Sequence, residues 1–397
     1  MSAGQVGVGI IGAGVISRHY LQNLTRFPDL SVLAIADLDL ERAAARAQEF
    51  GLRAMSVRDL LAADDIEIVL NLTIPAAHFD VSLQILTSGK HVWSEKPIAL
   101  GRRDARTLLD EADRRGLRVG CAPDTFLGGA LQTAQRTVTA GRIGAPASAL
   151  GIMQSPGPEG FHPNPAFYYG PGGGPLLDMG PYYVTALVQI MGAIHRVSAV
   201  SSTALPVRRV RVGTDAGTEF DVQVPTEHVG LLEFASGARA TLITSFDSGV
   251  RRNLLELYGD EATLQVPDPN YFDGVGHIVP LHGEPEEVPA AGSTWGRGVG
   301  VLELARSVRG GVPERASGSL AHHVLDVLLG IEEAARAGTT VTIESTVASP
   351  LPLDEEWDPT AATLPVSSTP SASSDGSVPP PTAGLGENAG TTVGINP

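Results

Sequence analysis

The sequence contains one cysteine, Cys121, in 397 residues. A lone cysteine cannot form an internal disulfide, which favours a reducing compartment. A long apolar run is also missing near the N-terminus, where the stretch at residues 6–17 is short and rich in glycine. Such a stretch is atypical of a signal peptide or a membrane span. We therefore expect a cytoplasmic protein with no membrane partner.

Basic residues are in deficit, with 28 Lys and Arg against 44 Asp and Glu and a formal net charge of −16. No Lys, Arg or His follows Arg336, but seven acids do, and removing them leaves −9 on the rest of the chain. A chain this acidic repels phosphate backbones. We therefore expect no nucleic-acid partner.

Lysine is the rarest basic residue, since only Lys90 and Lys96 occur and both lie in the stretch 88–100. Every other cation, apart from histidine, is an arginine. A lysine ammonium is compact and shifts its pKa readily on burial, whereas a guanidinium stays charged. The clustering of both lysines marks this stretch as a candidate for special chemistry.

The first part of the chain alternates short apolar segments with helical patterns. Gly51 ends one helix at the position where a left-handed residue is needed. The pattern predicts a strand and turn at 6–14, strands at 30–37, 66–73, 91–95 and 117–123, and helices between them, including 15–27 and 40–51. Strand–helix alternation of this kind predicts an α/β domain with a parallel sheet and helices on both faces.

The second part of the chain carries longer strand-like runs with hairpin spacing. Ser236 and Gly237 have the pattern of a hairpin turn. Helices are predicted at 128–144, 176–192 and 318–337, and strands at 146–155, 195–205, 227–247, 252–267 and 339–343. We predict an α+β domain with a largely antiparallel open sheet. The predicted domains are 1–126, 127–349 and a disordered, acidic tail rich in Ser, Pro and Gly at 350–397.

A glycine turn follows the first predicted strand and opens a helix. Gly12 permits the tight turn, and Gly14 lets the backbone approach a pyrophosphate at the helix N-terminus. Asp37, at the end of the second strand, is placed to accept a hydrogen bond from a ribose hydroxyl. The predicted cofactor-binding residues in this region are Gly12, Gly14, Val15, Ile16 and Asp37. The alternative is a glycine turn that only packs the helix on the strand.

The cofactor predicted for this turn is NAD rather than NADP. Asp37 would repel a 2′-phosphate, and the next residue, Leu38, offers no positive charge to bind one. Arg42 follows closely and leaves NADP as the less favoured alternative, because its guanidinium could reach the same position.

Lys96 precedes Pro97 just after a predicted strand. Residues at the carboxyl ends of parallel strands face the ligand crevice. A lysine there can donate to a substrate hydroxyl or favour the charged form of a neighbouring acid–base group. The alternative is an ordinary surface lysine.

Four segments together resemble the Gfo/Idh/MocA family of oxidoreductases: the glycine turn, "NLTIPAAH", "SGKHVWSEKPIAL" and "GGGPLLDMGPYYV". The resemblance covers residues 5–345. It implies an N-terminal Rossmann domain that binds NAD and homodimers or homotetramers built through the C-terminal sheet. It implies that Lys96 is catalytic, that Asp178 is the motif aspartate and that Lys90 is structural. It places Thr73, Ile74, His78, Glu95 and Lys96 at the cofactor, with a helix-start histidine as the alternative for His78.

Tyr182 departs from the histidine that many family members have four residues after the motif aspartate. Asp178 and Tyr182 share one face if their segment is helical. Both are expected near a helix N-terminus, whose partial charge favours a phenolate. Packing against the sheet is the alternative for Tyr182, and Tyr183 competes for the same acid–base role.

The predicted substrate pocket uses Lys96, Asp178 and Tyr182 together with three further residues. Asp124 follows a strand end, and His162 and Tyr168 lie in the Gly/Pro-rich loop at 155–175, where aromatic rings suit stacking on a sugar. Loop packing is the alternative for this pair. The adjacent histidines His322 and His323 have no partners at ligand spacing, so we predict no metal site.

The leading hypothesis is an NAD-dependent dehydrogenase for a secondary alcohol of a sugar, inositol or related polyol, with Tyr182 as base and Lys96 stabilising the developing alkoxide. The resemblance leaves open an NAD-dependent glycoside-cleaving enzyme that uses transient oxidation and elimination. A third hypothesis is a non-catalytic NAD- or sugar-binding sensor.

Overall fold

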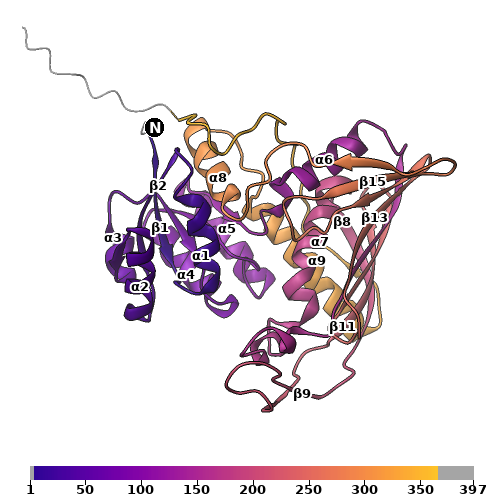
Figure 1. Ribbon diagram of the computed structural model, residues 1–397, viewed down its shortest axis with the longest axis horizontal. Helices are drawn as coiled ribbons and strands as arrows, with labels where there is room; N and C mark the ends of the chain where they lie inside the picture. Colours follow the sequence, from indigo (N-terminus) through magenta and orange to yellow (C-terminus); the bar gives the residue numbers. More distant parts are fainter. Residues whose placement is uncertain (1–3, 365–397) are drawn as a thin grey trace, which may run out of the picture.

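The computed structural model describes residues 4–364, which form two sheets joined by helices (Figure 1). The N-terminal sheet is parallel and six-stranded, in the order β3-β2-β1-β4-β5-β6. Its strands are β1 (Val6–Ile11), β2 (Leu30–Ala36), β3 (Arg53–Met55), β4 (Ile68–Asn71), β5 (His91–Ser94) and β6 (Val119–Cys121). The predicted Rossmann-type sheet is confirmed, and the strand order reverses between β1 and β4, where ligands bind in such sheets.

Helices cover both faces of this sheet because its strands are apolar on both sides. One core cluster joins Val8 and Ile10 to α1, and the other joins Ile11 to α3, α4 and α5. Gly51 ends α2 with φ 70°, as predicted. The helices are α1 (Val15–Leu24), α2 (Leu40–Phe50), α3 (Val57–Ala62), α4 (His78–Thr87) and α5 (Arg102–Arg115), with 3-10 turns η1 (Pro75–Ala77) and η2 (Thr125–Leu127).

The C-terminal sheet has nine strands in the order β16-β15-β14-β13-β7-β12-β11-β8-β17. It is largely antiparallel, as predicted, with one parallel pair between β7 and β12. Gly237 turns the β11–β12 hairpin with φ 90°. The strands are β7 (Pro146–Gln154), β8 (Ile194–Ser202), β11 (Glu227–Phe234), β12 (Arg239–Ser245), β13 (Arg252–Gly259), β14 (Ala262–Val266), β15 (Val275–Pro280), β16 (Glu286–Pro289) and β17 (Val341–Thr342).

Helices α6 (Gly129–Thr139), α7 (Gly174–Met191) and α9 (Gly318–Ala337) pack between this sheet and the N-terminal domain (Figure 1). The opposite face of the sheet carries no helix within residues 4–364. A small separate sheet, β9 (Val207–Arg209) with β10 (Glu219–Asp221), and the turns η3 (Pro158–Gly160) and η4 (Ala166–Tyr169) were not predicted. None of the helices in this part of the chain is long and apolar enough to cross a membrane.

The chain returns to the N-terminal domain after building the second sheet. Helix α8 (Val299–Gly310), which was not predicted, packs against α1 and β6. After α9 and β17, residues 350–364 return to the same domain, where the Asp29 carboxylate accepts hydrogen bonds from the backbone N–H groups of Thr363 and Leu364 at 2.9 and 3.0 Å. The disorder predicted from residue 350 is therefore wrong for 350–364, because Asp29 and Arg306 bind this segment. The rest of the predicted tail lies outside the described residues.

Candidate active site at the junction of the two domains

The glycine turn leaves room for a ligand at the start of α1. Gly12 has φ 106°, and a Cβ there would lie 2.5 Å from the carbonyl oxygen of Leu72, so only glycine fits. A Cβ on Gly14 would meet no protein atom within 4 Å. Helix α1 begins at Val15 without a side-chain cap. Its first N–H groups are therefore available to an anion such as a pyrophosphate.

Asp37 closes the same edge of the sheet. Its carboxylate accepts hydrogen bonds from the backbone N–H of Ala13 at 2.7 Å and of Asp39 at 2.9 Å. Arg42 Nη2 donates to it at 2.7 Å. Burial alone raises the pKa of Asp37, but the bonds from Arg42, Ala13 and Asp39 outweigh it and lower the pKa. Arg42, which could have served a 2′-phosphate, is thus held on an ionised carboxylate.

Three apolar side chains at this edge are exposed: Val15 by 81%, Leu38 by 96% and Ile74 by 69%. Apolar side chains around a polar turn are typical of a ligand cleft. The open space at Gly14, the carboxylate of Asp37 and these side chains together fit a dinucleotide. Gly12, Gly14, Val15, Asp37 and Ile74 lie at this edge, and Ile16 is half-buried against the core.

His78 does not face this cleft, contrary to the prediction that it contacts the cofactor. Its ring is fully buried, with Nδ1 2.6 Å from the carbonyl oxygen of Pro97 and Nε2 3.1 Å from that of Thr73. Burial lowers the pKa of His78. The histidine braces the two loops that follow β4 and β5, because both of its ring nitrogens lie against backbone carbonyls.

Glu95 lies at the carboxyl end of β5 and is bonded to Tyr20 of α1 and to the backbone of Lys96. Its Oε1 accepts from the hydroxyl of Tyr20 at 2.9 Å, and its Oε2 accepts from the backbone N–H of Lys96 at 3.0 Å. Burial and the neighbouring Glu95 raise the pKa of Tyr20. Tyr20 was not predicted from the sequence, because its helix position reads only as an apolar site.

The structure brings Lys96 and Asp178 together across the domain boundary. Lys96 Nζ donates to Asp178 Oδ1 at 2.9 Å and to the backbone carbonyl of the same residue at 2.6 Å. The two side chains are 15% and 27% exposed. Burial lowers the pKa of Lys96, but the charges of Asp178 and Tyr182 more than reverse this and raise it. Lys96 is therefore a fixed ammonium.

Tyr182 joins this pair from α7, with the Lys96 ammonium 5.4 Å from its ring centroid. Its side chain is 6% exposed. Because α7 begins at Gly174, with Pro175 in its first turn and Pro181 inside it, Tyr182 lies more than two turns into the helix. The expected help from the helix N-terminus is therefore wrong, since that effect falls off within the first turn.

The neighbouring Tyr183 points the other way. It is fully buried and donates its hydroxyl to the carbonyl of Ile152 at 3.0 Å. Of the two candidate tyrosines, only Tyr182 lies beside Lys96.

Arg297 completes the group and was missed from the sequence. Its Nη2 donates to the Tyr182 hydroxyl at 3.0 Å and to Asn270 Oδ1 at 3.0 Å. Arg297 immediately precedes the residue that caps α8, and Asn270 lies in the loop between β14 and β15. Neither belongs to a motif, so nothing in their spacing could have identified them.

Asp124 is placed elsewhere than predicted. It is 1% exposed, and its Oδ2 accepts hydrogen bonds from the backbone N–H groups of Gly298 at 2.9 Å and Gly300 at 3.1 Å. Burial raises its pKa to about 6. Asp124 therefore holds the start of α8, and the prediction that it contacts substrate is wrong.

The predicted loop aromatics lie at the edge of the cleft. The rings of His162 and Tyr168 meet edge to face, with centroids 5.4 Å apart. Burial, followed by the charge of Asp178, raises the pKa of Tyr168 to about 12. Tyr168 therefore lies close to Asp178, whereas His162 also packs edge to face against Phe167.

Lys90 has the structural role that the family resemblance implies. Its Nζ donates to the backbone carbonyls of Ala63 at 2.6 Å and Ile66 at 2.8 Å, and its side chain is buried. Burial lowers the pKa of Lys90. The two lysines therefore differ in kind, since Lys90 binds backbone and Lys96 binds a carboxylate in the cleft.

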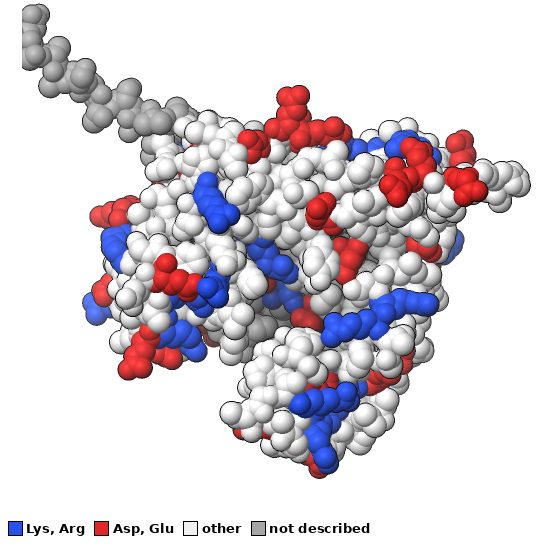
Figure 2. All heavy atoms as spheres, in the orientation of Figure 1, with Lys and Arg blue, Asp and Glu red and all other residues white. Residues whose placement is uncertain are grey.

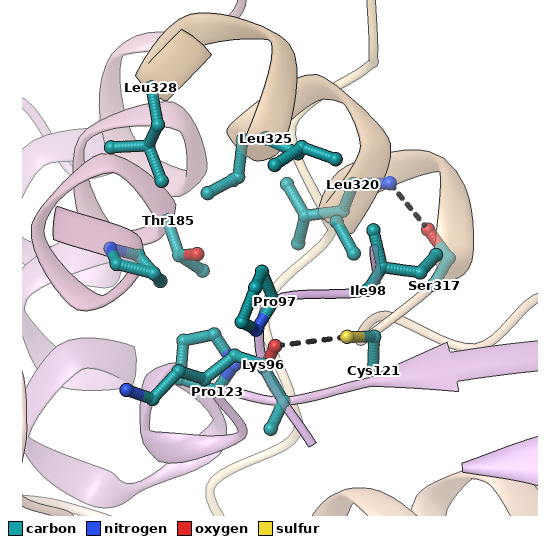
Figure 3. Close-up of a pocket in the computed structure, with 14 residues that line it drawn as sticks. Lys96, Pro97, Ile98, Cys121, Pro123, Thr185, Ser317, Leu320, Leu325 and Leu328 are labelled. Atoms are coloured by element: carbon teal, nitrogen blue, oxygen red, sulfur yellow. Dashed lines mark hydrogen bonds between the residues drawn. The ribbon is translucent and has the colours of Figure 1, made fainter. Parts of the chain in front are cut away.

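The surface is hollowed between the two domains, with basic side chains inside the hollow (Figure 2). A separate, small apolar cavity backs the site. Figure 3 shows Pro97 and Pro123 at one end of this cavity and leucines of α9 at the other, with the Lys96 ammonium turned away from them. Its volume of about 20 Å³ is far below the roughly 300 Å³ of small-molecule sites. It is a packing gap behind the lysine that is too small for a sugar substrate.

His323, one of the adjacent histidines, is fully buried and bonded within the fold. Its Nε2 accepts from the backbone N–H of Ile194 at 3.1 Å, and its Nδ1 lies 2.9 Å from the hydroxyl of Ser345. Both nitrogens are therefore used in joining α9 to the sheet.

Two family models match the chain. The model described as "Oxidoreductase family, NAD-binding Rossmann fold" matches residues 6–122, and the model described as "GFO/IDH/MocA C-terminal domain" matches residues 131–265. The first makes the N-terminal domain an NAD-binding domain.

Related proteins cover most of the fold. The chain is 29% identical over 297 residues to D-glucoside 3-dehydrogenase of Escherichia coli, across 71% of this chain and 83% of the relative. It is 32% identical over 163 residues to inositol 2-dehydrogenase 3 of Saccharopolyspora erythraea, across 40% of this chain and 48% of the relative. A solved structure of levoglucosan dehydrogenase with NADH and L-sorbose has a TM-score of 0.76 and 20% identity over 86% of this chain and 99% of that one. At this identity the structural likeness shows a shared fold.

Proposed function

Since the chain belongs to the Gfo/Idh/MocA family of NAD-binding oxidoreductases, we propose that it is an NAD-dependent dehydrogenase of a sugar, inositol or related polyol. It oxidises a secondary alcohol of this substrate to a ketone, or reduces the ketone in the reverse direction. The observation that carries the proposal is the group formed by Lys96, Asp178 and Tyr182 beside the dinucleotide-binding edge of the sheet.

Tyr182 acts as the base that removes the hydroxyl proton, and its phenolate becomes a phenol. Lys96 donates a hydrogen bond to the same substrate oxygen as negative charge develops on it. When NAD is bound, the chemistry it supplies is acceptance of the hydride from the alcohol carbon. In the reverse direction the phenol returns the proton.

Asp178 sets the direction of the Lys96 ammonium. The ammonium carries three hydrogens, and two of its bonds go to the carboxylate and the carbonyl of Asp178. The third is thereby aimed away from Asp178, and we assign it to the substrate oxygen. Tyr168, at the edge of the loop, supplies a ring face and a hydroxyl to the remainder of a polyol.

The discriminating assay is a panel of sugars, inositols and glycosides incubated with NAD and, separately, with NADP, followed by the absorbance of the reduced cofactor. Reduced NAD accumulating with a sugar or polyol supports the proposal. Aglycone release without net reduced cofactor replaces it with the glycoside-cleaving alternative, and no turnover with any member favours the sensor.

Substitution of the two lysines tests the catalytic assignment. Lys96→Ala is expected to lower kcat/KM by about 10²–10⁴-fold, with NAD binding intact. The matched control is Lys90→Met, which leaves two backbone carbonyls without their donor and costs about 1–3 kcal/mol of stability. Turnover per folded molecule should survive Lys90→Met within a few-fold. Turnover of Lys96→Ala within a few-fold of the parent would remove Lys96 from the mechanism.

We also propose that the protein forms homodimers or homotetramers through the uncovered face of the nine-stranded sheet. Val200 and Leu231 on that face are 66% and 57% exposed, and Val200 lies opposite Val229 across strands β8 and β11. Exposed apolar side chains gathered on one sheet face favour association. The double variant Val200→Glu, Leu231→Glu should sediment as a monomer. Leu281 is 84% exposed in the β15–β16 hairpin, and the control variant Leu281→Glu should not change the assembly. A monomeric parent protein would overturn this.

A further inference from the structure

We propose that Arg297 is the cation that holds Tyr182 as a phenolate, and that Asp124 positions Arg297 for this task. The inference rests on the proposed function, in which Tyr182 is the base. The sequence suggested that a helix N-terminus and Lys96 stabilise the phenolate. We assign this role instead to Arg297, which lies outside every motif.

The contacts of Arg297 fix its guanidinium on the Tyr182 oxygen. One nitrogen, Nη2, bridges the Tyr182 hydroxyl and Asn270 Oδ1, each at 3.0 Å. The backbone carbonyl of Arg297 accepts from Asn23 Nδ2 at 2.8 Å. Side chains from α1, from the β14–β15 loop and from α7 therefore hold this residue at the domain junction.

The positive charge of Arg297 has no carboxylate partner among the described residues of the site. Lys96 is paired with Asp178 at 2.9 Å, so its positive charge is already matched. No carboxylate oxygen in residues 4–364 lies within 4.0 Å of a nitrogen of Arg297. A largely buried guanidinium needs a counter-ion. The oxygen of Tyr182, once ionised, provides one at hydrogen-bond distance.

The carboxylates at longer range are bonded to other donors. Glu95 accepts from the Tyr20 hydroxyl and the Lys96 backbone. Asp124 accepts from the backbone of Gly298 and Gly300. Neither is directed at the guanidinium, so the phenolate remains the partner that Arg297 can bind directly.

Six charged or titratable groups lie around the pair formed by Tyr182 and Arg297. Lys96, Asp178 and Tyr168 lie around Tyr182, and Glu95, Asp124 and His19 lie around Arg297 at longer range. Burial lowers the pKa of Arg297, but the charge of Tyr182, ahead of those of Glu95 and Asp124, more than compensates and raises it. Burial and then the charge of Arg297 lower the pKa of the exposed His19. The Tyr182 oxygen is the one of these groups that Arg297 contacts at hydrogen-bond distance.

Asp124 fixes the turn from which Arg297 projects. Its Oδ2 accepts from Gly298 and Gly300, the residues directly after Arg297 in the first turn of α8. Gly298 has φ 107°, and a Cβ there would lie 3.0 Å from a methyl of Leu24. Glycine is therefore favoured at this point, two backbone bonds to Asp124 hold the turn, and Asp124 acts on Tyr182 through Arg297.

The test titrates tyrosine ionisation by ultraviolet absorbance in the cofactor-free full-length protein, without any substrate. The difference between a protein and its Tyr182→Phe partner isolates Tyr182. The difference is measured in the parent background, in Arg297→Met and in Arg297→Lys. Arg58→Met, an exposed arginine on α3, is the matched control for loss of one positive charge.

In Arg297→Met, the midpoint of the difference titration should rise by about one pH unit or more, a roughly tenfold loss of phenolate at fixed pH. Arg297→Lys keeps the charge, should restore part of the shift, and serves as the test if the methionine variant does not fold. Asp124→Ala should raise the midpoint by a smaller amount, because the turn that carries Arg297 loses the acceptor of two backbone N–H groups while the guanidinium keeps its charge. Arg58→Met should leave it unchanged.

An unchanged midpoint in both Arg297 variants overturns the proposal. So does a parent protein in which Tyr182 shows no ionisation below roughly pH 10, the ordinary value for tyrosine. The proposed function fails separately, by a different measurement: if Tyr182→Phe retains sugar-dependent turnover, Tyr182 is not the base, whatever the titration shows.

Discussion

His228 is expected to make the protein sensitive to mild acid, and its replacement should remove that sensitivity. The residue lies on β11, is 3% exposed, and neither of its ring nitrogens has a hydrogen-bond partner in residues 4–364. Directly opposite on β12 is Thr244, whose buried hydroxyl is also without a partner in this range. A charged imidazole at this position would have nothing to replace the water that it lost on folding.

The magnitude follows from the pKa. Burial lowers the pKa of His228 to about 4, against about 6.5 in an unfolded chain. The folded pKa is the lower one, so its contribution to stability is present above pH 6.5 and is lost as the pH falls toward 4. Between pH 7 and pH 5 the loss amounts to about 2 kcal/mol. His91, whose pKa burial also lowers to about 4, adds a similar loss in the same range.

The assay is urea unfolding of the parent and of His228→Leu at pH 7 and pH 5. Leucine fills a similar volume without polar atoms or charge, so the variant should be at least as stable at pH 7. The stability lost between the two pH values should shrink by about 2 kcal/mol, with the remainder due to His91 and the other groups that titrate in this range. His282→Gln, an exposed histidine in the β15–β16 hairpin, should behave as the parent. An equal pH dependence in His228→Leu and the parent would show that this imidazole is paired or hydrated in solution, and the reasoning would be wrong.

Three further predictions concern ligand binding. Asp37→Ala removes the carboxylate and releases Arg42, so the ratio of kcat/KM for NAD to that for NADP should fall at least tenfold. Gly14→Ala should fold normally, because Gly14 has φ −65° and open space at its Cβ position. The same variant should weaken NAD binding, measured by calorimetry, about tenfold or more. Gly12→Ala should instead lower the stability of the fold. Tyr168→Phe should raise KM for the polyol severalfold while the dissociation constant for NAD is unchanged; a changed NAD constant would place Tyr168 at the cofactor.

The sheet architecture was predictable because its signals are local. Apolar strands buried on both faces, the left-handed glycine at Gly51 and the turn at Gly237 each encode their conformation in a few neighbouring residues. Helix α8 was missed for the opposite reason. It follows a loop after the second sheet and packs on α1 of the first domain, so only long-range contact shows where it belongs.

The site was predictable only where a motif fixed the geometry. A position at a strand end places a residue near the cleft but does not say which way its side chain turns. His78 and Asp124 both follow strand ends, and both turn inward to bind backbone groups. Arg297 could not be predicted from the sequence, because the role that we propose for it depends on contact with Tyr182, 115 positions away.

The division of labour between lysine and arginine at this site has a chemical reason. Lys96 presents three hydrogens from one compact nitrogen, which lets it bind Asp178 through two acceptors and still donate to a substrate oxygen. A planar guanidinium in its place would spread its donors in a fixed fork and could not converge on the same point. In the role that we propose for it, Arg297 has the other task, to stay charged while largely buried beside a phenolate. A lysine there could lose its proton, since its pKa falls readily on burial, and the phenolate would then lose its counter-ion. If the proposed mechanism holds, a chain that uses arginine for nearly all of its cations needs lysine where a point donor must converge on a reacting oxygen, and arginine where a permanent charge must lie beside the base.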